Sequence, residues 1–333
     1  MKTALIKNIS DIIISDTEPL HVSANGIRIK VTASGICGTD VANAHQGLSA
    51  YQPFGHEVAG TVLETGTSVT RVKAGDNVVL ESASACGMCD NCRNGRQELC
   101  TDIQSFFNKP TSFGMAEEMN APAISAIRTS LSPDIATLSE PLAVAVDMVR
   151  LADIRCDSNV LIMGPGPIGL MALALVKRMG ARKVFISGRS TNKARLAVAE
   201  RFGVDAIVAP DKVTSYPYGC AIDRILVTAP PPVLNDAFAV AAKGAVVSYI
   251  GIGHGDDAFC RFDANVFHFK KLQLKASFAS PALYTPLALQ YLSEGVVDGA
   301  ALISHRFPLK DIAQAMKTAA DTAASVKVVI VQE

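Results

Sequence analysis

One stretch of the sequence limits the possible folds more than any other. A short apolar run, a glycine loop and a helical pattern follow one another there without a gap, at residues 160–163, 164–169 and 170–177. The loop reads Gly-Pro-Gly-Pro-Ile-Gly. A lone G-x-G-x-x-G pattern is a weak signal, but one that lies between a strand and a helix is typical of a dinucleotide-binding βαβ unit. An ordinary turn rich in glycine and proline is the alternative.

Each position of this loop has a predicted role. Gly164 would make the tight turn, and Gly166 would let the backbone approach a pyrophosphate. Gly169 would let the helix pack closely on the strand. Pro167 and Ile168 complete the predicted cofactor-binding loop, and the helix that follows it would turn its N-terminus towards the phosphates.

The same alternation of strands and helices continues beyond the loop. Strand-like runs lie at residues 160–163, 183–187, 206–208, 222–228, 245–250 and 272–275, and helical patterns at 170–177 and 194–201. Strands that alternate with helices predict βαβ units around a parallel sheet, and therefore an α/β fold class.

The segments before and after this alternating region have a different pattern of apolar residues. Short apolar runs such as 58–63 and 77–80 are broken by Gly, Asp, Asn and Pro, which is typical of a β-rich domain. After about residue 280 the alternation ends, with a helical pattern at 283–292 and a final strand at 326–331. With 333 residues, the chain is long enough for two ordinary domains.

The second strand of the predicted sheet indicates which cofactor is used. A fold specific for NAD usually has an acidic residue at the end of this strand, about 20 residues after the loop, to bind the ribose 2′-hydroxyl. Here the strand ends in Ser187 and is followed by Gly188 and Arg189, with Lys193 further on. Glycine would leave room for a 2′-phosphate, and arginine can bind that group with two hydrogen bonds. The sequence therefore favours NADP over NAD, unless the two basic residues are only solvated surface charges.

Four of the eight cysteines lie within fifteen positions. Cys86, Cys89, Cys92 and Cys100 follow the spacing C-x2-C-x2-C-x7-C. Four thiolates complete a tetrahedral zinc site and leave no position for a substrate, so this zinc would be structural. An iron–sulfur cluster is one alternative, although its bacterial pattern continues with x3-C-P. A zinc knuckle for nucleic acid is another.

Composition excludes several classes of partner. Lys plus Arg and Asp plus Glu number 31 each, so no excess of positive charge indicates nucleic acid or an anionic membrane surface. The apolar run near the N-terminus is too short for a signal peptide. No stretch approaches about 20 uninterrupted apolar residues. We therefore expect a cytoplasmic protein with no nucleic-acid or membrane partner.

Three further motifs are dispersed along the chain. They are Gly-Ile-Cys-Gly-Thr-Asp at 35–40, Gly-His-Glu at 55–57 and Ser-Glu-Pro-Leu at 139–142. In order and local sequence they resemble the zinc-containing medium-chain alcohol dehydrogenase family, most of all its polyol and threonine dehydrogenase branch. With the cysteine lobe and the glycine loop, the resemblance covers essentially the whole chain. It implies a GroES-like catalytic domain at 1–143 and 280–333, and a Rossmann domain at 144–279.

The resemblance also implies a catalytic zinc ion. Cys37 and His56 would be ligands, while Glu57 and Glu140 would share the remaining coordination, directly or through water, with one position open. A thiolate, an imidazole and a carboxylate suit zinc. Thr39 would accept the proton of the alcohol.

The expected proton relay is interrupted in this chain. Many relatives place a histidine five residues after the cysteine ligand, and this chain has Ala42 there. Asn43 or His45 would have to substitute, or water would enter directly.

We therefore expect a zinc-dependent oxidoreductase that transfers a hydride between a secondary alcohol or polyol and NADP. It would be a homo-oligomer, dimer or tetramer, like its relatives. An NADPH-dependent aldehyde or ketone reductase is one alternative, and a nucleotide-binding protein that has lost catalysis is another. We assign no chemistry to a further set of residues, and its aromatic members would either line a substrate cleft or pack in the core. The set is Cys156, Cys220, Cys260, His254, His268, Phe106, Phe107, Phe113, Phe278 and Tyr284.

Overall fold

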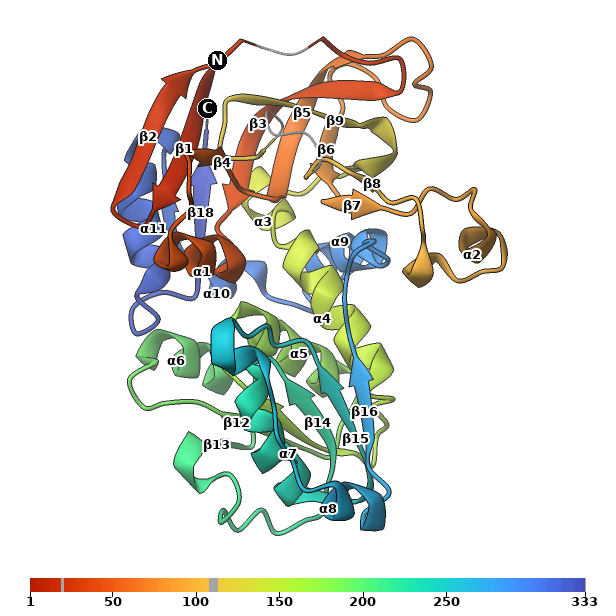
Figure 1. Cartoon of the computed structure of the whole chain (residues 1–333), viewed down its shortest axis with the longest axis vertical. Helices are drawn as coiled ribbons and strands as arrows, with labels where there is room; N and C mark the ends of the chain where they lie inside the picture. The colour runs from red at the N-terminus through yellow and green to blue at the C-terminus, as the bar shows by residue number, and fades with distance from the viewer. Residues whose placement is uncertain (19–20, 108–112, 333) are drawn as a thin grey trace. The chain divides into compact units, whose positions relative to one another are not determined.

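The structure is a computed structural model that describes residues 1–18, 21–107 and 113–332. The chain forms two compact units (Figure 1). Unit 1 consists of Met1–Ala143, Ala279–Asp321 and Ser325–Glu333, and unit 2 of Val144–Phe278 and Thr322–Ala324. Within the described residues, no helix is long and apolar enough to cross a membrane.

Unit 2 is built on a six-stranded sheet in which every pair of neighbouring strands is parallel. The strand order is β13-β12-β11-β14-β15-β16, which in chain order is 3-2-1-4-5-6, as in doubly wound dinucleotide-binding folds. This sheet confirms the predicted α/β class. The strands are β11 (Asn159–Met163), β12 (Lys183–Ser187), β13 (Ala206–Val208), β14 (Ile222–Val227), β15 (Ala241–Tyr249) and β16 (Gln273–Ala276).

The central strands of unit 2 are apolar along most of their length because helices cover the sheet, whereas the edge strand β16 is largely exposed. All five residues of β11 are buried. Alternate residues of the strands, such as Leu161, Phe185 and Val227, pack in one cluster with Phe238 of α7. The helices are α5 (Pro167–Arg178), α6 (Lys193–Arg201), α7 (Leu234–Val240) and α8 (Ala264–Phe269).

Unit 1 contains a seven-stranded sheet with the order β10-β6-β5-β3-β18-β17, in which β9 also pairs with β3. Strand β3 alternates, with Ile27, Ile29 and Val31 buried in the core. It lies between β5 and β18, so segments far apart in the sequence become neighbours at its end. The strands are β3 (Gly26–Gly35), β5 (Glu57–Thr65), β6 (Asn77–Leu80), β9 (Glu118–Pro122), β10 (Ala126–Arg128), β17 (Ile303–Phe307) and β18 (Lys327–Val331).

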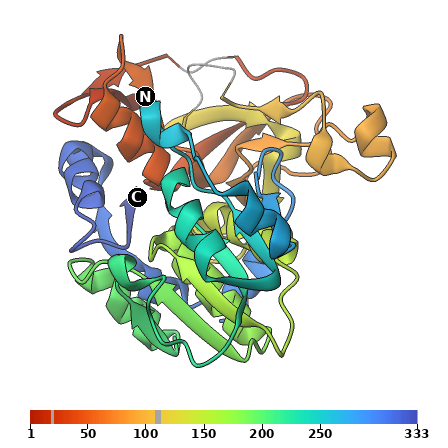
Figure 2. The ribbon, with the colours of Figure 1, turned by 60° about the horizontal axis from the view of Figure 1, so that its bottom comes forward.

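Smaller elements complete unit 1. A three-stranded sheet, β2-β1-β4, packs with helices α1 and α11 in a second core cluster. The cysteine lobe contains α2 and extends away from the sheets of this unit (Figures 1 and 2). The elements are β1 (Lys2–Asn8), β2 (Asp11–Asp16), β4 (Gln52–Pro53), β7 (Ala83–Ser84), β8 (Gln104–Ser105), α1 (Gly38–Gln46), α2 (Asp90–Arg93), α3 (Pro133–Ala136), α9 (Thr285–Ser293), α10 (Gly299–Leu302) and α11 (Ile312–Ala320). Helix α4 (Ser139–Leu151) begins in unit 1 and continues into unit 2.

Candidate active site

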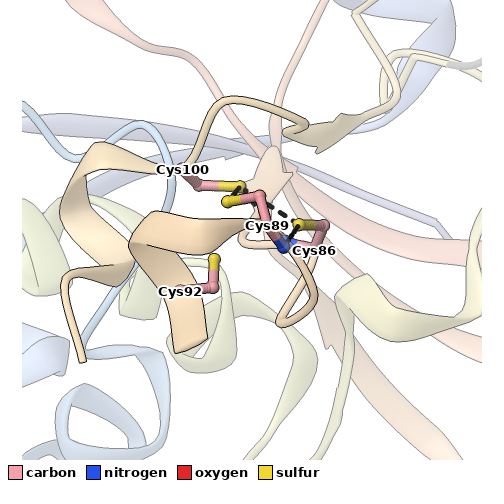
Figure 3. A group of neighbouring side chains, drawn as sticks. All are labelled: Cys86, Cys89, Cys92 and Cys100. Atoms are coloured by element: carbon pink, nitrogen blue, oxygen red, sulfur yellow. Dashed lines mark hydrogen bonds between the residues drawn. The ribbon is translucent and has the colours of Figure 1, made fainter. Parts of the chain in front are cut away.

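The four cysteines of the lobe turn their sulfur atoms towards one point (Figure 3). The Sγ of Cys100 lies 3.6 Å from that of Cys86 and 3.9 Å from that of Cys89, and all four sulfurs lie within 4.8 Å of one another. Four sulfurs about 2.3 Å from a tetrahedral zinc ion are about 3.8 Å apart. The distances therefore fit a zinc ion bound by Cys86, Cys89, Cys92 and Cys100.

Backbone amides of the lobe also donate hydrogen bonds to cysteine sulfurs, which favours the deprotonated, thiolate form. The N–H groups of Met88 and Cys89 donate to Cys86 Sγ, at 3.4 and 3.3 Å. Backbone hydrogen bonds from Cys92 and Thr101 lower the pKa of Cys89 to about 5, whereas burial raises the pKa of Cys92 to about 12. One thiol of the group is thus ready to lose its proton, as a metal ligand must.

A second group of donor atoms forms in unit 1. One ligand atom each of Cys37, His56 and Glu57 lies within 4.8 Å of the others. Cys37 caps the N-terminus of α1, and the carboxylate of Asp40 in its first turn accepts the Cys37 N–H at 2.9 Å. His56 and Glu57 are brought opposite by β5, which begins at Glu57 and pairs with the end of β3. The loop–helix junction and the strand thus place three predicted ligands together.

Glu57 is completely buried and is paired with a lysine that the sequence did not point out. The Nζ of Lys327 donates to Glu57 Oε1, and also to the carbonyl oxygen of Ile36 at 3.0 Å. Burial lowers the pKa of Lys327, but the charges of Glu57, Cys37 and Glu140 and the hydrogen bond to Glu57 together outweigh burial and raise this pKa above its usual value. The other carboxylate oxygen, Oε2, is buried and has no hydrogen-bond partner among the described residues.

Asp40 lies beside the imidazole of His56. Its Oδ1 is 3.8 Å from His56 Nδ1, within the range of a charge interaction but longer than a hydrogen bond. Burial lowers the pKa of His56, but the negative charges of Cys37 and Asp40 outweigh it and hold the pKa well above its usual value. Burial raises the pKa of the Asp40 carboxyl. The histidine therefore lies in a strongly negative environment, which also favours a cation.

Glu140, the second residue of α4, is close to this group but is not one of the three converging donors. Burial, aided by the charge of Glu57, raises the pKa of Glu140 to about 7, against the opposite effect of His56. The structure thus places this carboxylate within electrostatic reach of His56 and Glu57, outside the three converging donors. Thr39 is exposed on α1, as are Asn43 and His45.

The donor set fits zinc. It combines a sulfur, a ring nitrogen and a carboxylate oxygen, which are the usual zinc donors. The orphaned Oε2 of Glu57 is costly in a buried site unless a ligand such as a cation satisfies it. Cys37, His56 and Glu57 would hold the ion, and Glu140 is a fourth acidic or metal-ligating side chain close to them.

The aromatic residues singled out in the sequence differ in how deeply they are buried and in whether they contact the donors. The ring of Phe107 lies 5.6 Å from that of His56 and is 46% exposed, so it forms a wall beside the donors. Phe113 contacts Phe107, whereas Phe106 is fully buried in the core. Phe278 is exposed in unit 2. Tyr284 precedes α9, while the remaining residues that we set aside, Cys156, Cys220, Cys260, His254 and His268, are exposed or half-buried outside both donor groups.

The glycine loop of unit 2 has the geometry of a tight strand–helix turn. Gly164 has φ of +119°, which disfavours any residue with a side chain, and its N–H donates to the Ser187 carbonyl. A Cβ on Gly169 would collide with the Gly164 carbonyl. A Cβ on Gly166 would contact nothing, so this point of the loop borders open space. Helix α5 begins there with Pro167 and Ile168.

The structure gives a different reason for glycine at position 188 from the one we expected. A Cβ on Gly188 would lie 2.8 Å from Pro165 Cγ and 2.9 Å from Leu196 Cδ2, so close packing already occupies that position. Arg189 follows as an exposed residue, and Lys193 is exposed at the first position of α6. The end of β12 thus lacks an acidic side chain and is followed by two exposed cations.

Comparisons with known proteins agree with this geometry. Residues 23–130 match the model of the alcohol dehydrogenase GroES-like domain, and residues 167–294 that of the zinc-binding dehydrogenase domain. The chain is 30% identical to an L-threonine 3-dehydrogenase of Rhizobium etli (strain CIAT 652), over 93% of either chain. It is 28% identical to a sorbitol dehydrogenase of Bacillus subtilis (strain 168), over 96% of this chain and 93% of the relative.

A solved structure has the same fold. It is described as a short chain alcohol dehydrogenase from Escherichia coli CFT073 complexed with NADH, and it matches with a TM-score of 0.88 and 24% identity. The match covers 100% of this chain and 99% of that one. The two family models, the relatives and the two donor groups lead to one conclusion: the chain belongs to the zinc-containing medium-chain alcohol dehydrogenase family and is an oxidoreductase.

Proposed function

We propose that this protein is a zinc-dependent dehydrogenase that transfers a hydride between a secondary alcohol or polyol and NADP. The observation that carries the proposal is the convergence of Cys37, His56 and Glu57, with one buried carboxylate oxygen of Glu57 unpaired. A zinc ion bound there would act as a Lewis acid and lower the pKa of an alcohol hydroxyl. The names of the sorbitol and threonine dehydrogenase relatives support a polyol or a hydroxy compound as substrate.

The side chains around the donors have separate tasks in this proposal. Thr39 accepts the hydroxyl proton and, because it is exposed, passes it to water. Ala42 cannot carry a proton, and His45 lies six residues after Thr39, about 240° around the helix, on another face of α1. Phe107 supplies an apolar wall that limits the access of water to the reacting carbon. Proton release therefore passes from Thr39 to water or to Asn43, which lies four residues on along the same face of α1.

The preference for NADP rests on the residues that follow β12 in this chain. Close packing of Pro165 and Leu196 disfavours an acidic side chain at position 188, which would repel a 2′-phosphate. Arg189 and Lys193 are both exposed nearby in sequence and can bind that phosphate.

Replacing Arg189 with Ala tests the cofactor preference. We expect the KM for NADP to rise about 10- to 100-fold, since a charge-assisted pair is worth about 1.5–3 kcal/mol, while the KM for NAD changes little. The control is Arg201→Ala at the other end of α6. Equal effects of Arg189→Ala on both cofactors would disprove the 2′-phosphate assignment.

We also propose a homo-oligomer formed through the edge of the unit 2 sheet. Strand β16 is an edge strand, and Phe269, Leu274 and Phe278 on or beside it are 71%, 41% and 73% exposed. A second copy could pair with this edge and cover these side chains. Light scattering should show a dimer or tetramer that Leu274→Glu converts to a smaller species. A wild-type monomer would contradict the proposal.

The function itself is tested by combining metal content with a substrate screen. About two zinc ions per chain, and oxidation of some polyol, sugar acid or secondary alcohol with NADP, are the expected results. One zinc ion per chain and no turnover with any of these compounds would support the alternative, a nucleotide-binding protein without catalysis.

A further inference from the structure

The ion pair between Lys327 and Glu57 is the most deeply buried pair of opposite charges near the donors. The side chain of Lys327 is 3% exposed and that of Glu57 is 0% exposed. Removing two charges from water is expensive unless each one is well hydrogen-bonded. Lys327 meets this condition, since Nζ donates to Glu57 Oε1 and to the Ile36 carbonyl, which directly precedes Cys37.

The sheet explains why these two residues can meet. Gly35 on β3 pairs with Glu57 of β5 on one side and with Val329 of β18 on the other. Val329, Gly35 and Glu57 are direct partners across the strands, so they share one face of the sheet. Lys327 lies two residues before Val329, so its side chain points to that same face. A Cβ on Gly35 would collide with the Glu57 carboxylate. The glycine therefore leaves the gap through which the carboxylate and the amine reach each other.

We propose that Lys327 is a positioning residue that holds Glu57 so that a single carboxylate oxygen is offered to the metal. Because the amine occupies Oε1, only Oε2 of this carboxylate is left without a hydrogen-bond partner among the described residues, and the carboxylate converges with Cys37 and His56. Glu57 then acts as a ligand through one oxygen, and a position stays open for the alcohol. Lys327 touches neither metal nor substrate in this arrangement. The inference rests on the metal site proposed above.

The positive charge of Lys327 has a second consequence. Three carboxyl groups, those of Asp40, Glu57 and Glu140, influence one another at this site. An amine that is already present offsets part of their mutual repulsion before any metal binds. The donors are thus arranged in advance, which is the condition for tight and selective binding.

The test compares Lys327→Met, which keeps an unbranched side chain one atom shorter and removes the charge, with the conservative Lys327→Arg. The readouts are zinc per chain after dialysis against a series of chelator concentrations, and the visible spectrum of the cobalt-substituted protein. We expect Lys327→Met to lose one metal ion at about tenfold lower chelator concentration, to retain the other, and to show an altered cobalt spectrum. Lys327→Arg should restore most of both properties. If Lys327→Met does not fold, Lys327→Gln carries the same expectation.

A matched control is available in unit 2. Lys270 also directs its amine at backbone, with Nζ donating to the carbonyls of Phe238, Ala239 and Ala241 at 2.7–3.0 Å. Lys270→Met should lower the Tm without changing metal retention or the cobalt spectrum. A second control is Glu57→Gln, in which the effect of Lys327→Met on metal retention should vanish if the lysine acts through Glu57.

The outcomes distinguish a failure of the proposed metal site from a failure of the positioning role of Lys327. If the wild type retains only one zinc ion, the proposed catalytic site itself fails, whatever Lys327 does. If the wild type retains two and Lys327→Met retains both with an unchanged spectrum, only the positioning role is overturned. An equal loss of metal in Lys270→Met would also overturn it, since the effect would then follow from general destabilisation.

Discussion

The two donor groups of unit 1 are assembled in opposite ways. The cysteine lobe takes all four donors from residues 86–100, within one protruding loop. The second group takes its donors from the N-terminus of α1, the start of β5 and, nearby, the start of α4, and it depends on β18 for Lys327. A local site stabilises the loop that contains it, whereas a dispersed site depends on the whole sheet. The first suits a structural role and the second suits an adjustable, catalytic one.

The largest expected difference follows from Cys37→Ser. Because a catalytic zinc supplies several kcal/mol of transition-state stabilisation, we expect turnover to fall by about 10³-fold or more with little change in Tm. Steady-state kinetics and thermal unfolding measure the two effects. Cys156→Ser, at an exposed cysteine outside both groups, is the control. Substantial activity in Cys37→Ser would remove Cys37 from the ligand set.

The opposite pattern is expected for Cys92→Ala. Loss of a structural zinc should cost about 3–5 kcal/mol of stability, because binding of the ion contributes folding energy. Metal analysis should show one zinc ion fewer per chain, and the protein that remains folded should still turn over substrate. Cys260→Ala serves as the control. A variant as stable as the wild type would contradict the structural role of the lobe.

A smaller effect tests how far the second group depends on the sheet. Gly35→Ala should cost about 1–3 kcal/mol, since the added methyl group collides with the Glu57 carboxylate, and it should weaken metal retention. Gly38→Ala, three residues away at the start of α1, adds a methyl group that meets nothing and should be nearly neutral. Similar stabilities for these two variants would show that Glu57 adapts easily.

The difference between the groups also explains what the sequence could predict. Regular spacing identified the lobe without any knowledge of the fold. The strands of the unit 2 sheet were predicted within a few residues, because they are continuous apolar runs between helical patterns. Cys37, His56 and Glu57 look ordinary in isolation, and only the resemblance to a family brought them together. The structure adds that Glu140 lies just outside the converging donors.

Other features were missed for identifiable reasons. Strand β3 has a clear alternation at Ile27, Ile29 and Val31 that a stricter search for period two would have found. Asp40 ends the Gly-Ile-Cys-Gly-Thr-Asp motif, and its position three residues after the helix cap was the signal for its contact with the Cys37 N–H. Lys327 carried no such signal. A single lysine is expected at the surface, because lysine is rarely buried without a partner, and its partner is known only once the strand pairing of the sheet is known.

The separation of 270 residues between Glu57 and Lys327 also sets an order of events during synthesis. Ribosomes add roughly 5–20 residues per second, so Lys327 is made on the order of 14–54 s after its partner. The four cysteines of the lobe, by contrast, are all made within about 3 s. All four thiols of the lobe are therefore available long before the amine that pairs with Glu57 has been made. Synthesis completes the donors of the local group early, whereas the dispersed group gains its lysine only at the end of the chain's synthesis.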